Sequence, residues 1–192
     1  MRHPPTKTAL RKAALAYRAG LSAPQRQRLS EQIMDRVRHY LQQQPEPVRA
    51  VLTYRAMPSE VDTGALFQLP DYRIFAPVTH HQKQMAWRLI TPQTRWKKGM
   101  FGILEPAAGH LWQQQEATVL LCPLTAFDRQ GNRLGMGKGC FDFWLSRHRR
   151  YLDRVVGLAF SGQEVAQIPA EGHDAPMDCI ITENEVIQCR TI

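Results

Sequence analysis

The sequence predicts an α/β fold, built as a three-layer α/β/α sandwich around a largely parallel sheet. Three observations lead to this class. Apolar runs of strand length alternate with helical periodicity, a glycine-rich turn joins one apolar run to a helix, and no internal repeat interrupts the alternation. A chain of 192 residues is long enough to bury one sizeable core. We therefore expect residues 1–192 to form a single domain.

Two helices are predicted at the start of the chain. Residues 6–19 carry small and apolar side chains on one face, and Gly20 follows as a stop. Ser22 is an N-cap candidate for a second helix, which ends before Pro45. Its apolar stripe consists of Leu29, Ile33, Val37 and Leu41.

The middle of the chain is predicted to hold three strands and a long loop. The strands are expected at 48–54, 72–77 and 85–90, where apolar and β-branched residues gather. Between the first two strands, Ser59 is expected to cap a short helix. Residues 91–109 are expected to form a loop.

The second half of the chain is predicted to alternate in the same way. An apolar strand at 117–122 leads through a turn to a helix at about 140–151. Strands follow at 154–160 and 179–182, and 183–186 is expected to be a short tail. In open α/β sheets, ligands bind outside the carboxyl ends of the strands, so the site is expected at that edge.

The turn after the strand at 117–122 has the composition of a phosphate-binding loop. Gly135, Gly137 and Gly139 occupy alternate positions, with Arg133 just before them and Lys138 among them. Glycine lets backbone N–H groups approach an anion, and the following helix presents its own unpaired N–H groups to the same anion. The two cations would add full positive charge. The pattern therefore favours a nucleotide phosphate site.

The glycine pattern by itself leaves alternatives open. It does not match the Walker A motif, because Asn132 takes the place of the first glycine and Gly139 that of the Ser/Thr. An ordinary connection between a strand and a helix has the same composition. Asp142, in the first turn of the helix, is a candidate ligand for a divalent cation. Glu60 is a candidate ligand contact or, alternatively, an acid that complements a helix dipole.

The chain is basic, and part of that charge lies on the first predicted helix. Lys7 and Arg11 are four residues apart, so they project from one side of it. Such a pair is either a solvated face or a clamp for a polyphosphate or carboxylate. The formal net charge of +8 favours anionic ligands without naming one. Nucleic acid is one candidate, although the sequence has no zinc finger, RNP-like strand or basic region running into heptads.

Composition excludes several other classes of protein. An apolar content of 43% with 8% aromatic residues is typical of a globular protein. No apolar run approaches the length of a membrane span, and no secretory signal is recognisable. The four cysteines lack zinc-ligand spacing, which indicates thiols in a reducing cytosol.

Several phrases of the sequence occur together in one order. They are Lys7-Thr-Ala-Leu-Arg11, Met57-Pro-Ser-Glu60, Phe101-Gly-Ile-Leu-Glu-Pro106, Pro123-Leu-Thr-Ala-Phe-Asp128, Gly131-Asn-Arg-Leu-Gly-Met-Gly-Lys-Gly139 and Asp142. The pattern P-L-x-A-F-D-x-x-G-x-R-L-G-x-G-K-G is highly specific, whereas the N-terminal K-x-x-x-R is weak alone. With these phrases the chain resembles, over nearly its whole length, the 5-formyltetrahydrofolate cyclo-ligase family, also called methenyltetrahydrofolate synthetase.

The resemblance implies a fold related to the sugar-phosphate isomerase and CoA-transferase-like folds. It implies a cytoplasmic, monomeric enzyme that uses Mg²⁺ and ATP and acts on a reduced folate, with no membrane or nucleic-acid partner. Such enzymes turn 5-formyltetrahydrofolate into 5,10-methenyltetrahydrofolate, ADP and phosphate. The formyl oxygen attacks the γ-phosphate of ATP, N10 of the folate then closes the ring, and phosphate departs.

The resemblance also assigns roles to individual residues. Lys138 and Arg133 are implied as catalytic groups that neutralise phosphate charge. Asp142 matches a magnesium ligand, and Asp174 is the best match for a second one. Glu60 matches an acid that touches the pterin. The implied substrate-binding residues are Arg55, Glu60, Met136, Gly137, Lys138, Gly139 and Cys140. The implied ATP-binding residues are Lys7, Arg11, Arg133, Leu134, Gly135, Met136, Gly137, Lys138, Gly139, Cys140 and Phe141.

The sequence departs from the family pattern beside the glycine loop. The family usually has two tyrosines before the aspartate and often arginine after it, whereas this chain has Cys140, Phe141 and Phe143 around Asp142. Hydrogen bonds from the missing side chains are therefore not expected here. Two other functions stay open: a related phosphotransferase acting on another small substrate, and a basic nucleic-acid-associated protein.

Overall fold

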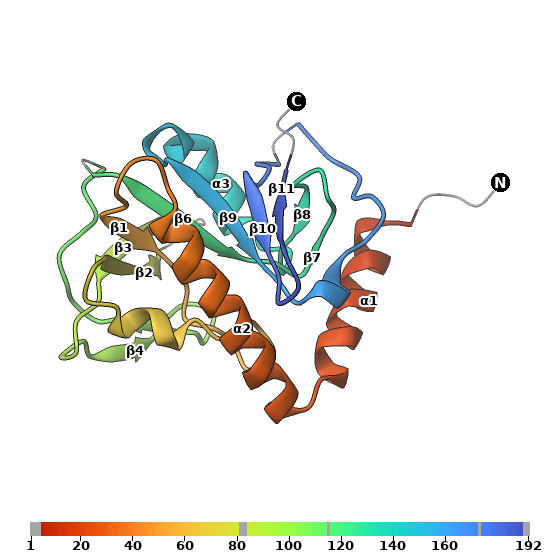
Figure 1. Cartoon of the computed structure of the whole chain (residues 1–192), viewed down its shortest axis with the longest axis horizontal. Helices are drawn as coiled ribbons and strands as arrows, with labels where there is room; N and C mark the ends of the chain where they lie inside the picture. Colours follow the sequence, from red (N-terminus) through yellow and green to blue (C-terminus); the bar gives the residue numbers. More distant parts are fainter. Residues whose placement is uncertain (1–4, 81–83, 115, 173, 190–192) are drawn as a thin grey trace.

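The protein is built around one seven-stranded sheet, shown in Figure 1. Its strands are β1 (Ala50–Leu52), β2 (Arg73–Thr79), β3 (Met85–Leu89), β6 (Thr118–Pro123), β9 (Arg154–Leu158), β10 (Cys179–Ile181) and β11 (Val186–Gln188). The computed structural model describes residues 5–80, 84–114, 116–172 and 174–189. The strand order is β11-β10-β9-β6-β1-β2-β3. Strands β10 to β2 of this order run parallel, and the two outermost strands are antiparallel to their neighbours.

Two capped helices, α1 (Lys7–Gly20) and α2 (Ala23–Gln42), precede the sheet. The hydroxyl of Thr6 accepts a backbone N–H of the first turn of α1 at 3.2 Å. At the start of α2, Ser22 and Gln25 form a capping box, in which each side chain accepts the backbone N–H of the other. Both predicted helices are confirmed, including the N-cap at Ser22.

Helices cover both faces of the sheet, which confirms the predicted α/β/α sandwich. Adjacent residues of β1 point to opposite faces, so Val51 packs in the cluster that contains Ile33 of α2. Leu52 packs in the other cluster with Trp144 of α3 (Cys140–His148). Figure 1 shows α2 across one face of the sheet and α3 behind it, whereas α1 stands beside β7 (Ala126–Phe127). Among the described residues, no helix is both long and apolar enough to cross a bilayer.

The prediction of a loop at 91–109 is wrong. The segment forms an antiparallel hairpin of β4 (Trp96–Lys98) and β5 (Leu104–Pro106). Each strand has only three residues, and β5 exposes Leu104 while it buries Glu105. A pattern that exposes the apolar residue and buries the charged one reverses the alternation by which strands are recognised. The hairpin therefore could not be found from periodicity.

Two further short segments were assigned wrongly. The expected tail at 183–186 leads into β11, which pairs with β10 at the sheet edge. Within the turn that follows β6, β7 pairs with β8 (Arg133–Leu134) in a separate two-stranded ribbon. Strands of two or three residues carry too few positions to show a period of two. The predicted helix at 140–151 consists of α3 followed by the 3₁₀ turn η3 (Arg149–Tyr151).

Ser59 does not cap the short helix after β1. That helix is the 3₁₀ segment η1 (Gly64–Gln68), which follows Thr63. The hydroxyl and the carbonyl of Ser59 instead accept hydrogen bonds from Arg18 at 2.7 and 2.8 Å. The Ser59 hydroxyl, which was expected to cap the helix, is bonded to the buried Arg18 instead, and the helix begins at Gly64.

Candidate active site

A cavity of about 300 Å³ lies at the carboxyl edge of the sheet. It is bordered by residues that follow β6 and β1 and by the carboxyl end of β2, as expected for an open α/β sheet. The β4–β5 hairpin lines the cavity through Ile103, Leu104 and Glu105, and the Phe101 ring in its turn lies near Lys138 of the glycine loop. We call the glycine-loop side, with Gly135, Met136, Lys138 and Gly139, the loop end. We call the side formed by Pro77, Thr79, Met85, Ile103 and Glu105 the wall end.

The loop end is made of exposed residues on an unusual backbone. Gly137 and Gly139 have φ angles of 88° and 68°, in the left-handed region that favours glycine. A Cβ on Gly137 would meet no atom within 4 Å, so conformation rather than space explains this glycine. Gly139 is the N-cap of α3. The exposed Lys138 places its Nζ atom 5.9 Å from the centroid of the Phe101 ring, across the cavity. The loop thus offers backbone N–H groups and an exposed cation to an anion.

Arg133 and Asp142 form an ion pair in the floor of the loop end. The distance between Nη2 of Arg133 and Oδ1 of Asp142 is 2.5 Å, and the arginine also donates to the carbonyl of Ala175. The side chain of Arg133 is 5% exposed, whereas that of Asp142 is 30% exposed. The ribbon strand β8 fixes the arginine, and the first turn of α3 fixes the aspartate. Asp142 therefore presents a carboxylate to the cavity on a rigid support.

Helix α1 supports the loop from outside the cavity. Nε of Arg11 donates to the carbonyl of Gly135 at 3.0 Å. Nζ of Lys7 lies 2.9 Å from Asp174 and 3.0 Å from Glu171. Burial lowers the pKa of Lys7, but hydrogen bonds to these two carboxylates outweigh it and leave the pKa raised. Lys7 and Asp174, predicted as an ATP contact and a metal ligand, are thus paired with each other.

Glu60 lines the cavity and lies against a buried arginine. Oε2 of Glu60 accepts the N–H of Met57 at 2.9 Å, and Oε1 lies 4.0 Å from Nη2 of Arg18. Burial raises the pKa of Glu60. The hydrogen bond from the Met57 N–H and the charge of Arg18 lower this pKa, but they only partly offset the effect of burial. Burial likewise lowers the pKa of Arg18, whose side chain is 1% exposed. Arg55 also lines the cavity, and its guanidinium lies over the Trp96 ring, 4.5 Å from the ring centroid.

Sequence reasoning did not identify Arg18. The residue lies seven positions after Arg11, on the apolar face of α1 that buries Leu10 and Ala14. An arginine on the apolar stripe of an amphipathic helix was the available signal, because such a cation needs a buried partner. The pairing with Ser59 and Glu60 itself is a tertiary contact that no spacing in the sequence reveals.

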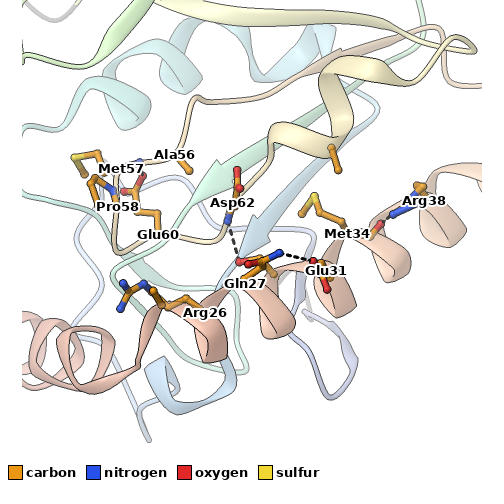
Figure 2. Close-up of a pocket in the computed structure, with 13 residues that line it drawn as sticks. Arg26, Gln27, Glu31, Met34, Arg38, Ala56, Met57, Pro58, Glu60 and Asp62 are labelled. Atoms are coloured by element: carbon orange, nitrogen blue, oxygen red, sulfur yellow. Dashed lines mark hydrogen bonds between the residues drawn. The ribbon is translucent and has the colours of Figure 1, made fainter.

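A second, larger cavity of about 480 Å³ lies between α2 and the segment 56–65. Figure 2 shows Gln27, Glu31 and Met34 on α2 facing the segment that carries Met57 and Glu60. Met57 and Glu60 line both cavities, so the turn between them separates the two. Of the residues predicted to bind substrate, nucleotide or metal, only Glu60 lines this second cavity. The smaller cavity is therefore the candidate site.

Most of the predicted site residues line the candidate cavity. Leu134, which does not, is 2% exposed and packs with Leu10 and Ala14, so only its backbone can serve a ligand. No group of three or more His, Cys, Asp or Glu residues within the described ranges forms a ready metal cage. The predicted residues that line the cavity are Arg55, Glu60, Arg133, Gly135, Met136, Lys138, Gly139, Cys140, Phe141 and Asp142. Those that do not are Lys7, Arg11, Leu134, Gly137 and Asp174.

The comparisons with known proteins all lead to one enzyme family. The model of the 5-formyltetrahydrofolate cyclo-ligase family matches residues 4–183. The chain is 30% identical to the 5-formyltetrahydrofolate cyclo-ligase of Haemophilus influenzae over 83% of its own length and 88% of that protein. The enzyme of the same name from Escherichia coli K12 is 29% identical over 88% of the chain and 96% of that protein. The Aquifex aeolicus 5,10-methenyltetrahydrofolate synthetase superposes with a TM-score of 0.78 at 31% identity, covering 97% of this chain and 94% of that one.

Proposed function

The chain belongs to the 5-formyltetrahydrofolate cyclo-ligase family, and from this membership we propose that it cyclises 5-formyltetrahydrofolate to 5,10-methenyltetrahydrofolate with ATP. The reaction releases ADP and phosphate. We further propose that the enzyme acts in the cytoplasm as a monomer, as the resemblance implies.

One observation carries the proposal: a single cavity joins a cationic glycine loop to an apolar wall. Lys138, Arg133 and the loop N–H groups suit a triphosphate at the loop end. Pro77, Met85 and Ile103 suit a flat ring system at the wall end. A reaction that transfers phosphate to a folate requires both ligands in contact, and one continuous cavity allows this.

The first chemical step is phosphoryl transfer. A lone pair of the formyl oxygen forms a bond to the γ-phosphorus of ATP, and the bond from that phosphorus to the bridging oxygen breaks, which releases ADP. Phosphoryl transfer depends mainly on positioning and charge neutralisation. Lys138 is proposed to contact the transferred phosphoryl group, because its side chain is exposed and lines the cavity. Arg133, held by Asp142 and the Ala175 carbonyl, is proposed to supply a fixed charge.

The second step closes the ring. The lone pair of N10 attacks the former formyl carbon, and the carbon–oxygen bond breaks as phosphate departs with that oxygen. The proton on N10 passes to water. The cations at the loop end are proposed to stabilise the departing phosphate, since its charge grows as the bond breaks.

The donor set at the loop end fits a magnesium ion. Mg²⁺ is commonly held by one or two carboxylates together with substrate phosphate oxygens and water, rather than by a cage of protein ligands. Asp142 lines the cavity and is rigidly placed, so we propose it as the protein ligand. Asp174 would have to leave Lys7 to take part. When bound, the ion would neutralise charge on the phosphates.

The test is the absorbance of 5,10-methenyltetrahydrofolate formed from 5-formyltetrahydrofolate by the purified protein. We expect product only when ATP and Mg²⁺ are both present, with one ADP released for each product. Omission of either component, and addition of a chelator, serve as controls. Product formed without ATP, or none with both present, would reject the proposal. ADP release with another small acceptor and no folate turnover would favour the related phosphotransferase.

A further inference from the structure

Glu105 is a buried acid of the cavity wall that the proposed chemistry does not use. The residue is 5% exposed and lies on β5, within the phrase Phe101–Pro106. It lines the wall end of the cavity. Its Oε1 atom accepts the N–H of Thr79, at the end of β2, at 3.0 Å.

The carboxyl group of Glu105 has a single hydrogen-bond partner within the described ranges. None of the ion pairs among the described residues includes it. In the same described ranges, the N–H of Thr79 is its one hydrogen-bond donor, and Oε2 receives none. Oε2 is not among the fully buried side-chain atoms without a partner in the described ranges, so it is open to the cavity that Glu105 lines. A carboxylate oxygen that is open to a cavity can accept hydrogen bonds from a ligand.

The surrounding chain leaves space for this carboxyl group. A Cβ on Gly99 would lie 2.1–2.4 Å from the carboxyl atoms of Glu105. Gly99 does not have a positive φ angle, so close approach rather than conformation accounts for the glycine. The N–H of Gly99 donates to the carbonyl of Ile103 at 2.8 Å and so closes the hairpin next to the acid. Glu105 is thus held in one position by the hairpin and by β2.

Glu60 and Glu105, the two glutamates that line the cavity, differ in the partners that they already have. Glu60 already accepts the Met57 N–H and faces Arg18. Glu105 forms no ion pair with any residue that the structure describes, and it lines the cavity together with Pro77, Met85 and Ile103 of the wall end. An apolar slot with one fixed acceptor pair fits a flat ring that carries two adjacent N–H donors on its edge.

We propose that Glu105 recognises the aminopyrimidine edge of the reduced pterin. One carboxylate oxygen accepts the ring N3–H, and the other accepts an N–H of the exocyclic 2-amino group. The inference rests on the proposed function and adds a specificity-determining residue to it. It also sets the orientation of the folate, with the pyrimidine at the wall end and the formyl group toward the glycine loop.

The experiment compares Glu105→Gln with wild type by titration calorimetry of 5-formyltetrahydrofolate. The amide keeps the volume and can still accept the Thr79 N–H, but it cannot accept two further N–H donors as a charged pair. We expect the dissociation constant for the folate to rise roughly 10- to 100-fold. The dissociation constant for ATP and the midpoint of thermal unfolding should not worsen. Glu46→Gln, at an exposed position, is the matched control and should change neither constant.

A second arm uses an analogue in which hydrogen replaces the 2-amino group of the pterin. Wild type should bind this analogue more weakly than the parent folate, whereas Glu105→Gln should bind the two almost equally. Unchanged folate affinity in Glu105→Gln would overturn the inference while wild-type turnover still supports the function. A loss shared by folate and ATP, or a drop in thermal stability, would show a structural role and also overturn it. Wild type that neither binds nor converts the folate would reject the function and the inference together.

Discussion

The charged residues in and around the cavity differ in how exposed they are. At the loop end, Lys138 is exposed and stands on glycines with positive φ angles. Away from the loop, the charged groups are parts of the core: Arg18, which lies behind Glu60, is 1% exposed, and Glu105 of the wall end is 5% exposed. An exposed charge on a loop can bind a substrate without stabilising the fold. A buried charge affects both substrate binding and the stability of the fold. Substitutions at the two ends should therefore separate activity from stability.

The largest effect is expected from Arg18→Met. Removal of one partner of a buried pair leaves the other charge unmatched, so the free energy of unfolding should fall by about 3–5 kcal/mol. The Ser59–Glu60 turn loses its two hydrogen bonds as well, so the KM for the folate should rise. Denaturant unfolding and steady-state kinetics measure the two effects. Arg28→Met, at an exposed position of α2, is the control.

Arg18→Lys separates charge from geometry at the same site. Lysine keeps the positive charge near Glu60 but offers a single nitrogen where arginine uses two to hold Ser59. We expect most of the stability to return while the folate KM stays raised. Full recovery of both quantities would mean that Arg18 acts only through its charge, and recovery of neither would exclude a positioning role.

The opposite result is expected from Lys138→Ala at the loop end. Loss of a cation that stabilises the transferred phosphoryl group should lower kcat roughly 10²- to 10³-fold. The free energy of unfolding should change by no more than about 0.5 kcal/mol, as for other exposed positions. Lys12→Ala on α1 is a matched exposed control. If Lys138→Ala lost stability in proportion to activity, the distinction between the two ends would fail.

The loop end and the wall end also differ in how far they could be predicted from the sequence. The loop end was accessible from the sequence, because alternate glycines, a lysine and an apolar strand are all local features. The wall end was not, because β4 and β5 are three residues long and bury Glu105 instead of Leu104. Arg18 meets Ser59 across 41 positions of sequence, so no spacing rule could pair them. The sheet itself was predictable, since buried parallel strands such as β6 are continuous apolar runs.

A smaller effect at the loop end is expected from Asp142→Asn. The amide is a weaker ligand for a hard cation, so the Mg²⁺ concentration for half-maximal rate should rise about 10-fold at saturating ATP. A magnesium titration of the initial rate measures this. Asp71→Asn, at an exposed position before β2, should leave the requirement unchanged. If Asp142→Asn behaved like that control, Asp142 would have no place among the metal ligands.

The smallest effect concerns Glu60, where the two cavities meet. Burial raises its pKa in the folded protein above the usual 4.5. Below pH 4.5 the acid is protonated in both the folded and the unfolded chain, so it carries no penalty. As pH rises from there through the folded pKa, the unfolded chain ionises first, and the folded state loses stability until both are ionised. Denaturant unfolding across this range should show wild type losing stability relative to Glu60→Gln as pH rises. A constant difference between the two would mean that Arg18 and the Met57 N–H fully compensate the burial of this acid.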